Sequence, residues 1–304
     1  MKTKIILFLL CLATLNTMGQ TNGTITRQRK TTAKKETQQR KTTQAAPKKT
    51  QPARQAQQQK PAASTSMPKV SLDDIMRNMV YVEGGTFTMG ATSEQKKPDD
   101  DEKPTHRVSL SSFYIGKYEV TQALWKAVMG SNPSRFEGDN QPVERVSWND
   151  CQTFLRKLNA MTGKNFRLPT EAEWEFSARG GNRSRGYQYS GSNVLSDVAW
   201  YADNSGMKTH NVGTKAPNEL GIYDMSGNVW EWCQDWRGYY YGYSQTNPTG
   251  PRSGPYRVIR GGGWSGGARF CCVANRDMNT PDCGIINLGF RLALSQAFFF
   301  LLIP

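Results

Sequence analysis

Residues 218–232 read NELGIYDMSGNVWEW, and this stretch has the character of most of the chain after residue 70. Glycine, asparagine and serine form a turn around Gly227 and Asn228, and Trp230 and Trp232 follow it directly. The 304 residues include eight tryptophans and twelve tyrosines, and most of these rings must be buried with their polar atoms hydrogen-bonded. Because long periodic stretches are few, we expect an aromatic core held by irregular backbone.

Three segments around this stretch carry the signals of short helices. Ser147 and Asp150 have capping-box spacing at the start of residues 147–163, and Gly163 ends that segment. Residues 170–180 start with a second capping box, and residues 120–130 form a third candidate. The expected buried face of the first helix consists of Cys151, Phe154, Leu155, Leu158 and Met161.

Short β-like runs lie at residues 87–90, 106–116 and 256–262. No Gly/Pro-rich linker interrupts residues 80–294, and no internal repeat is visible. The sequence therefore predicts one α+β domain at residues 70–294, rich in loops and with little regular secondary structure.

The N-terminal segments have a different composition. Residues 1–19 have the basic start, short apolar run and small residues of a secretory signal peptide. Residues 20–69 contain twelve Lys/Arg, one acid and no Trp, Tyr, Phe or Leu, so we predict a disordered basic linker. Residues 71–304 contain 25 Lys/Arg and 24 Asp/Glu, so the net charge of +14 comes almost entirely from the N-terminal segments. The folded part is therefore not expected to bind nucleic acid, whereas the basic linker is a candidate for contact with an acidic envelope surface.

Export would place the protein in the periplasm, on the cell surface or outside a bacterium. Cys11 lies within the signal's apolar run, and Leu10 before it is not the small residue that lipid attachment requires just before the cysteine. Five cysteines follow the signal, and an odd number cannot all pair within the chain. Only two histidines occur, which excludes a three-histidine metal site, and "GGGWSGG" lacks the following Lys-Ser/Thr of a phosphate loop.

Several runs together resemble the formylglycine-generating enzymes, also called sulfatase-modifying factors. They appear in the family's order over residues 78–294 and include YVEGGTFTMG, FRLPTEAEWEFSARGG, NELGIYDMSGNVWEW, RVIRGGGW and NLGFRL. The resemblance implies a C-type-lectin-like fold. It also implies an oxidase that uses copper and oxygen to convert a sulfatase cysteine to formylglycine.

The copper site of that family has two cysteines five residues apart, and only one of them is present here. Cys271 aligns with the second copper cysteine, whereas Gly266 stands at the position of the first and Gly263 at that of a serine. If the chain were active, Cys271 would be the catalytic residue. Because one thiolate cannot form the pair, we expect no copper and no catalytic residue, and the copper-dependent oxidase is kept as the alternative function.

The resemblance also implies a structural calcium site in DMSGNVWEW. Asp224 and Glu231 would supply carboxylates, and Gly227 and Val229 would supply backbone carbonyls, which are the hard oxygen ligands that calcium prefers. The competing interpretation is a turn with a capping aspartate and a surface glutamate. Asp203 and Asn204 are weaker candidates for a second calcium site.

The segment from Trp264 to Asn287 mixes very small residues with hydrophobic ones, which is typical of a binding rim on a fixed scaffold. Trp264 and Phe270 are the expected anchors for an unknown protein or glycan ligand. A surface diversified by a retroelement and an ordinary exported accessory domain both stay open. Residues 295–304, SQAFFFLLIP, form an apolar tail. The predicted ligand-binding residues are Trp264, Ser265, Gly266, Gly267, Phe270, Cys271, Cys272, Ala274, Cys283, Gly284, Ile285 and Ile286.

Overall fold

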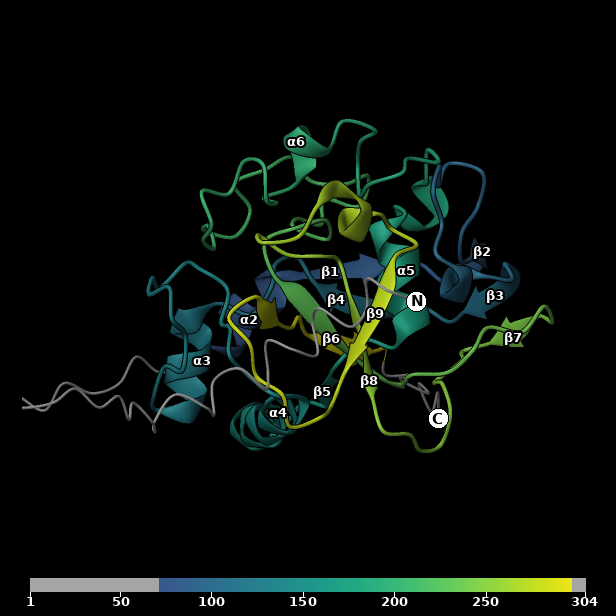
Figure 1. Cartoon of the computed structure of the whole chain (residues 1–304). Helices are drawn as coiled ribbons and strands as arrows, with labels where there is room; N and C mark the ends of the chain where they lie inside the picture. Colours follow the sequence, from purple (N-terminus) through teal and green to yellow (C-terminus); the bar gives the residue numbers. More distant parts are fainter. Residues whose placement is uncertain (1–70, 297–304) are drawn as a thin grey trace, which may run out of the picture. The chain divides into compact units, whose positions relative to one another are not determined.

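The computed structural model describes residues 71–296. The predicted signal peptide, the basic linker and the tail from residue 297 lie outside the described residues. The α-helices are α2 (Leu72–Arg77), α3 (Gln122–Met129), α4 (Trp148–Thr162), α5 (Glu171–Ala178) and α6 (Leu195–Val198), and the 3₁₀ helices are η1 (Asp100–Glu102), η2 (Gly181–Arg183) and η3 (Ala268–Cys271) (Figure 1).

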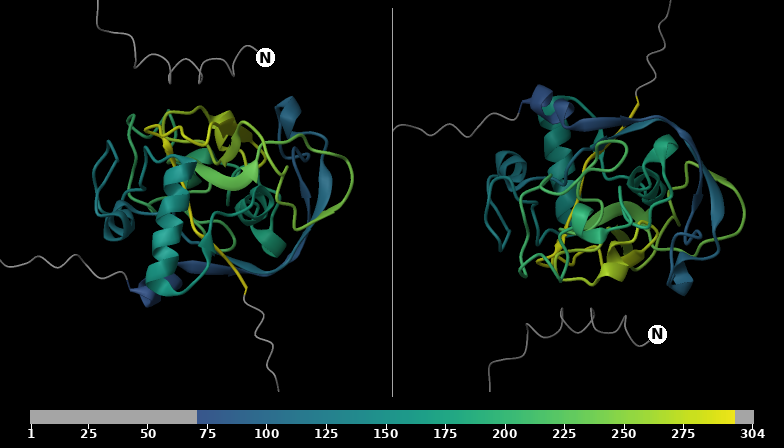
Figure 2. Two further views of the ribbon diagram at one scale, coloured as in Figure 1. Left: turned by 90° about the horizontal axis from the view of Figure 1, so that it is seen from below. Right: turned by 90° about the horizontal axis from the view of Figure 1, so that it is seen from above.

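Short strands form three small sheets in the described part of the chain. One has the order β1 (Met79–Val82), β4 (Phe113–Gly116), β11 (Ala293–Ser295), β5 (Phe166–Arg167). A second has the order β10 (Leu288–Gly289), β6 (Trp230–Trp236), β8 (Arg257–Arg260), β9 (Arg276–Asn279). The third has the order β2 (Gly85–Met89), β3 (His106–Leu110), β7 (Gln245–Thr246). Long irregular segments connect these elements, as Figure 2 shows from below and above, so the predicted loop-rich α+β architecture is confirmed.

The three predicted helices form where their capping signals stand. The Ser147 hydroxyl accepts the Asp150 N–H at 3.1 Å, and the Asp150 carboxylate accepts the Ser147 N–H at 3.0 Å. Thr170 and Glu173 make the same reciprocal cap on α5. Such caps stabilise a helix by about 1 kcal/mol each, which matters for helices this short.

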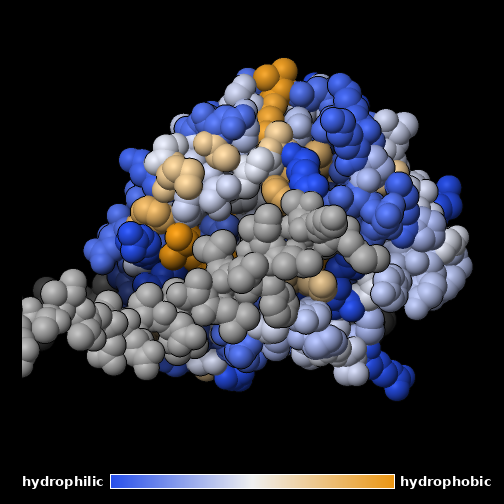
Figure 3. Space-filling model, in the orientation of Figure 1, coloured by the Kyte–Doolittle hydropathy of each residue, from blue (hydrophilic) through white to orange (hydrophobic). Residues whose placement is uncertain are grey.

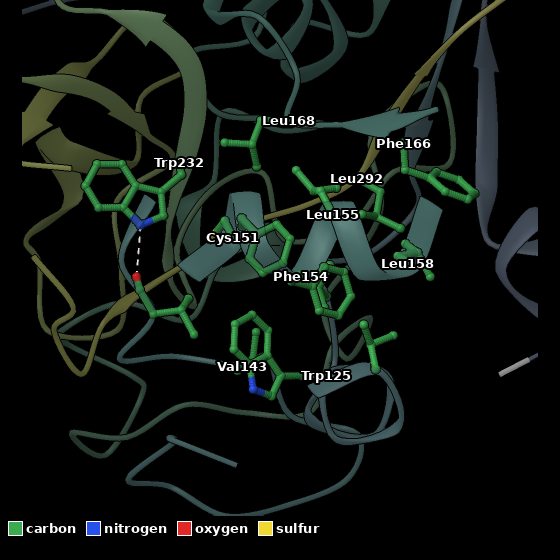
Figure 4. Close-up of a cluster of buried hydrophobic side chains, with 14 of the residues drawn as sticks. Trp125, Val143, Cys151, Phe154, Leu155, Leu158, Phe166, Leu168, Trp232 and Leu292 are labelled. Atoms are coloured by element: carbon green, nitrogen blue, oxygen red, sulfur yellow. Dashed lines mark hydrogen bonds between the residues drawn. The ribbon is translucent and has the colours of Figure 1, made fainter. Parts of the chain in front are cut away.

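Helix α4 contributes one side of the main hydrophobic core (Figure 4). The Phe154 ring stacks on Trp125 of α3 at 5.2 Å, and its edge meets Phe290 at 5.4 Å. The Trp232 indole N–H donates to the Val146 carbonyl at 3.0 Å, which ties β6 to the loop before α4. Met161, expected on the buried face, is 54 % exposed because it lies in the last turn, beyond the core.

Helix α5 is buried along its whole length, although four of its eight residues are polar. Its Glu171 and Glu175 pair with Arg276 of β9 and Arg260 of β8. Because breaking a buried pair leaves an uncompensated charge and costs about 3–5 kcal/mol, these arginines fix the sheet β10-β6-β8-β9 against α5. The loops that precede and follow β9 therefore start from a rigid base.

Candidate functional site

The predicted rim begins at a tight crossing of two backbone segments. Gly262 has φ 74°, and a Cβ atom there would lie 2.9 Å from the carbonyl of Phe270 and 3.0 Å from the sulfur of Cys271. Only glycine combines this backbone conformation with so close an approach. The glycine run after β8 therefore serves to fold residues 263–271 back over the end of the sheet.

Trp264, predicted to be an anchor for a ligand, is instead part of the scaffold. It is 4 % exposed, its indole N–H donates to the Ile286 carbonyl at 3.0 Å, and its ring meets the edge of Phe136 at 5.4 Å. The Ser205 hydroxyl donates to the Trp264 carbonyl at 2.8 Å. The side chain thus joins the start and the end of the segment 264–287, which corrects its predicted role as a contact residue.

Four predicted contact residues are buried and are corrected here. They are Trp264, Cys271, Cys272 and Ala274. The turn η3 directs both cysteines inward, where they pack with Tyr189 and Leu195 in a small apolar cluster. Residues on either side of a tight turn cannot all face solvent. The sequence near η3 shows no regular pattern of polar and apolar residues from which the buried ones could have been predicted.

The other predicted contact residues reach the surface to different degrees. Ser265, Gly267 and Gly284 are exposed, and Gly266, Phe270, Cys283, Ile285 and Ile286 are half-buried. The Asn287 amide donates to the Ser265 hydroxyl at 3.0 Å, which holds the two parts of this surface together. The exposed guanidinium of Arg269 lies 4.4 Å from the centre of the Phe270 ring. We call residues 265–270 and 282–286 the contact loops.

The cysteines of this region are poorly suited to copper. Burial raises the pKa of Cys271 far above its usual range, and it raises the pKa of Cys272 to about 11. A copper(I) site needs thiolates, and position 266 has no side chain. Cys151 and Cys233 are likewise buried free thiols with raised pKa values, caused chiefly by burial. The residues present do not fit the two-thiolate copper centre that the resemblance implies.

Glu231, a predicted calcium ligand, has another partner. It is fully buried, and its two oxygens accept the Arg291 guanidinium at 2.5 and 2.6 Å. The Trp174 indole N–H also donates to it at 2.8 Å. The interpretation as a surface glutamate is therefore wrong, and Glu231 anchors the end of the chain to β6.

Asp224, the other carboxylate of the predicted calcium loop, retains a free oxygen. It is 3 % exposed, one oxygen accepts the Gly213 N–H at 2.6 Å, and Oδ1 is buried with no hydrogen-bond partner. Burial raises the pKa of the nearby Glu119 well above its usual range, and Asp224 and Glu231 add to the shift. The buried Oδ1 of Asp224 is an oxygen ligand of the kind that a divalent cation prefers, whereas Glu231 would have to share both of its oxygens with the Arg291 guanidinium.

The described residues contain no group of three or more His, Cys, Asp or Glu side chains that could jointly hold a metal ion. Two carboxylates with backbone carbonyls remain compatible with this. The weaker candidate, Asn204, is engaged elsewhere: its amide donates to the Ala199 carbonyl at 2.9 Å and its oxygen accepts the Tyr201 N–H at 2.9 Å. Asn204 shapes a turn, and a second calcium site there has no support from these contacts.

Sequence reasoning missed a hollow beside the start of α5. The connection from β6 to β8, with the run RGYYYGY at residues 237–243, forms much of its wall. The repeated tyrosines were a signal that could have pointed to it. The described helices include none long and apolar enough to cross a membrane.

Comparisons with known proteins identify the family of this chain. A family model described as the sulfatase-modifying factor enzyme 1-like domain matches residues 63–296. The chaperone protein LppX of Paenibacillus barcinonensis is 38 % identical over 253 residues, covering 67 % of this chain and 82 % of that protein. The formylglycine-generating enzyme of Streptomyces coelicolor is 32 % identical over 302 residues, covering 77 % and 94 %.

Two solved structures extend the likeness to the fold. Treponema denticola variable protein 1 has a TM-score of 0.65 and 35 % identity, covering 72 % of this chain and 95 % of that one. PvdO from Pseudomonas aeruginosa has a TM-score of 0.61 and 28 % identity, covering 72 % and 94 %. The matched region includes α4, α5, the calcium-like loop and both contact loops. The chain therefore belongs to the sulfatase-modifying factor family, and residues 71–296 form one domain with that family's C-type-lectin-like fold.

Proposed function

We propose that the protein is an exported, non-catalytic member of its family that binds a protein or glycan partner through the contact loops. The observation that carries this proposal is that, within residues 264–287, some side chains hold the backbone in place and others reach solvent. Trp264, Asn287 and the buried Arg276 hold the backbone, while Ser265 and Gly267 are exposed, and Phe270 and Ile285 pack against the main core and keep part of their surface in solvent. Fixed loops with exchangeable surface residues are typical of binding sites.

The surface chemistry is compatible with such a role. On the uncovered part of the face that carries η3, small hydrophobic patches lie among hydrophilic residues (Figure 3). Isolated apolar patches bordered by polar groups are characteristic of surfaces that bind transiently. Two relatives add support through their names, since one is a chaperone and the other a variable protein.

Site-specific cross-linking tests the contact loops. A photo-cross-linking residue at the exposed Gly267 is expected to capture a discrete partner from an envelope extract of the source cells. The same residue at Met207, which is 60 % exposed but outside the contact loops, serves as the matched control and is expected to capture none. Equal labelling from both positions, or none from Gly267, contradicts the proposal.

The coding DNA decides whether this surface is diversified. In that case the codons for Ser265, Gly267, Phe270 and Ile285 would align with adenines in a nearby, nearly identical repeat beside a reverse-transcriptase gene. Without such a repeat the protein is an ordinary accessory domain. Neither result depends on the partner's identity.

The alternative function, copper-dependent formation of formylglycine, is favoured by the 32 % identity to the Streptomyces enzyme. Against it stand the absence of a side chain at Gly266 and the burial of the Cys271 thiol. We further propose that calcium, bound by Asp224, Glu231 and the carbonyls of Gly227 and Val229, has a structural role. It would balance the negative charge of this loop and take no part in ligand contact.

A further inference from the structure

The connection between β6 and β8 carries an unusual set of exposed aromatic rings. Tyr239, Tyr241 and Tyr243 are 84, 54 and 60 % exposed. Figure 2 shows this segment passing outside β2 and β3, and its strand β7 pairs with β3. Single exposed aromatics are ordinary on a protein surface. Here three exposed tyrosines occur within five residues, on backbone that sheets hold at both ends. This arrangement indicates a surface that contacts a ligand.

These tyrosines border a hollow of about 600 Å³, which lies within the usual range of small-ligand sites. Tyr241 and Tyr243 stack at 5.5 Å with an angle of 14° between their planes. Tyr240 turns inward, where its ring meets the edge of His106 at 4.8 Å and its hydroxyl donates to Glu171 at 3.2 Å. The hollow therefore offers flat rings at its mouth and polar groups inside.

Three charged side chains that line the hollow, Arg276, Glu171 and Arg237, already take part in ion pairs. Arg276 makes two bonds to Glu171, at 2.5 and 2.7 Å, and its guanidinium lies 3.9 Å from the centre of the Tyr240 ring. Arg237 pairs with Asp101 at 2.6 Å. Burial, with a further contribution from the Glu171 charge, raises the pKa of Asp235 to about 8, so this carboxyl is uncharged at neutral pH.

The exposed rings at the mouth and the paired charges in the lining limit which class of ligand the hollow can bind. A charged ligand would bring a charge into the hollow with no free opposite partner, which is costly when desolvated. A purely apolar ligand would leave the buried Nε of Arg237, which lines the hollow, without a hydrogen-bond partner. A sugar has flat C–H faces that pack against aromatic rings and hydroxyls that exchange hydrogen bonds at its edges.

We propose that the hollow between the start of α5 and residues 236–251 binds a neutral oligosaccharide, with Tyr241 and Tyr243 as the stacking platform. The site is separate from the contact loops. It is built by the connection between β6 and β8 together with residues of α5, β2, β3 and β9. The two binding activities can therefore be lost independently.

The test is binding of the full chain to immobilised neutral hexaoses of glucose, mannose, galactose and N-acetylglucosamine, followed by calorimetry with the best of them. The double variant Tyr241→Ala, Tyr243→Ala and the single variant Tyr239→Ala are compared with Tyr81→Ala. Tyr81 is a suitable control because it is 46 % exposed and also paired with a tyrosine, at 5.3 Å, but lies on β1. Circular dichroism melts confirm that each variant folds.

Saturable binding to at least one hexaose is expected, weakened at least tenfold in the double variant and unchanged in Tyr81→Ala. Absence of binding to all four hexaoses overturns the proposal, as does full binding by the double variant. Binding of a decaproline peptide in place of the sugars would also overturn it and assign the hollow to proline-rich chains. Cross-linking from Gly267 is expected to be the same in all these variants, so failure of this site is distinguishable from failure of the contact loops.

Discussion

Trp264 and Ser265 are neighbours in the chain, yet one is buried and the other exposed. Trp264→Ala removes a ring that packs on Phe136 and an indole that bonds to Ile286, so it should lower the free energy of unfolding by about 3–5 kcal/mol. Ser265→Ala should change it by no more than about 0.5 kcal/mol. Urea denaturation measures both. Equal, small effects would return Trp264 to the role of a contact residue.

Asp235 should give the stability a distinctive dependence on pH. Burial raises its pKa from an ordinary value of 3.8 to about 8 in the folded chain, and repulsion by Glu171 and Glu173 adds to the shift, whereas Arg276 opposes it. Between pH 4 and 8 the folded state therefore keeps a proton that the unfolded state releases, and this group's contribution to stability falls as the pH rises. The loss is at most about 1.4 kcal/mol per pH unit.

Asp235→Asn removes that titration and keeps an oxygen that can accept the Glu171 N–H, which Asp235 accepts at 2.9 Å. The stability of the variant relative to the natural protein should therefore increase steadily from pH 5 to pH 8. Urea denaturation at four pH values measures the difference. A difference that is constant across this range would show that Asp235 is ionised in the folded protein.

For single residues, the sequence predicted some features of the site and not others. Gly266 and the single aligned cysteine were visible in the sequence because they are matters of residue identity. The burial of Cys272 was not visible, because it depends on how η3 turns and on which distant side chains, such as Tyr189, pack against the cysteine. The sequence states which residue occupies each position, whereas the burial of a side chain depends on how distant segments pack.

Among the elements, the helices were predictable and the central strand was not. α4 and α5 are specified by residues three positions apart, Ser147 with Asp150 and Thr170 with Glu173, so their signals are local. Strand β6 is buried on both faces over Trp230–Cys233 and therefore lacks the alternation of a surface strand. Its partners β8 and β10 are reached only after long irregular segments, which no local pattern encodes.

The predicted calcium loop, which precedes and enters β6, leads to a prediction about the stability of this element. Asp224 has a buried oxygen without a partner and lies near Glu119 and Glu231, so removing a bound cation would leave these charges in mutual repulsion. Chelation with EGTA should lower the melting temperature by several degrees, and excess calcium should restore it. Asp224→Asn should abolish the response, because asparagine tolerates the backbone φ of 60° but carries no charge.

Asp203→Asn is the matched control for this experiment, since Asp203 is an exposed aspartate outside the loop. It should keep the full response to EGTA. A melting temperature unaffected by EGTA in the natural protein would remove calcium from the loop and leave Glu231 solely as the partner of Arg291. Loss of the response in Asp203→Asn would move the ion to the second candidate position.

For the whole molecule, the fold of a formylglycine-generating enzyme is kept while the copper site is incomplete. Buried ion pairs formed by Arg260, Arg276 and Arg291 hold the sheet, α5 and the C-terminal strands in place without any contribution from the contact loops. Because the exposed Ser265 and Gly267 take no part in these ion pairs, they can be exchanged at little cost, whereas Phe270 and Ile285 of the contact loops pack against the main core. With this separation, the same scaffold carries an enzyme in the Streptomyces coelicolor relative and the proposed binding surface in this chain.

The incomplete copper site leads to a prediction about formylglycine formation. Incubated with copper(I), oxygen and a sulfatase peptide that contains cysteine, the protein should give no aldehyde product detectable by mass spectrometry. The physical reason is that formation of the copper site needs two thiolates, whereas Gly266 supplies none and burial holds the pKa of Cys271 far above neutral pH. The Streptomyces coelicolor enzyme, assayed in parallel, shows that the conditions support the reaction. Aldehyde formed at an ordinary enzymatic rate, and lost in Cys271→Ser, would establish that a single thiol at this position suffices and that the protein is an oxidase.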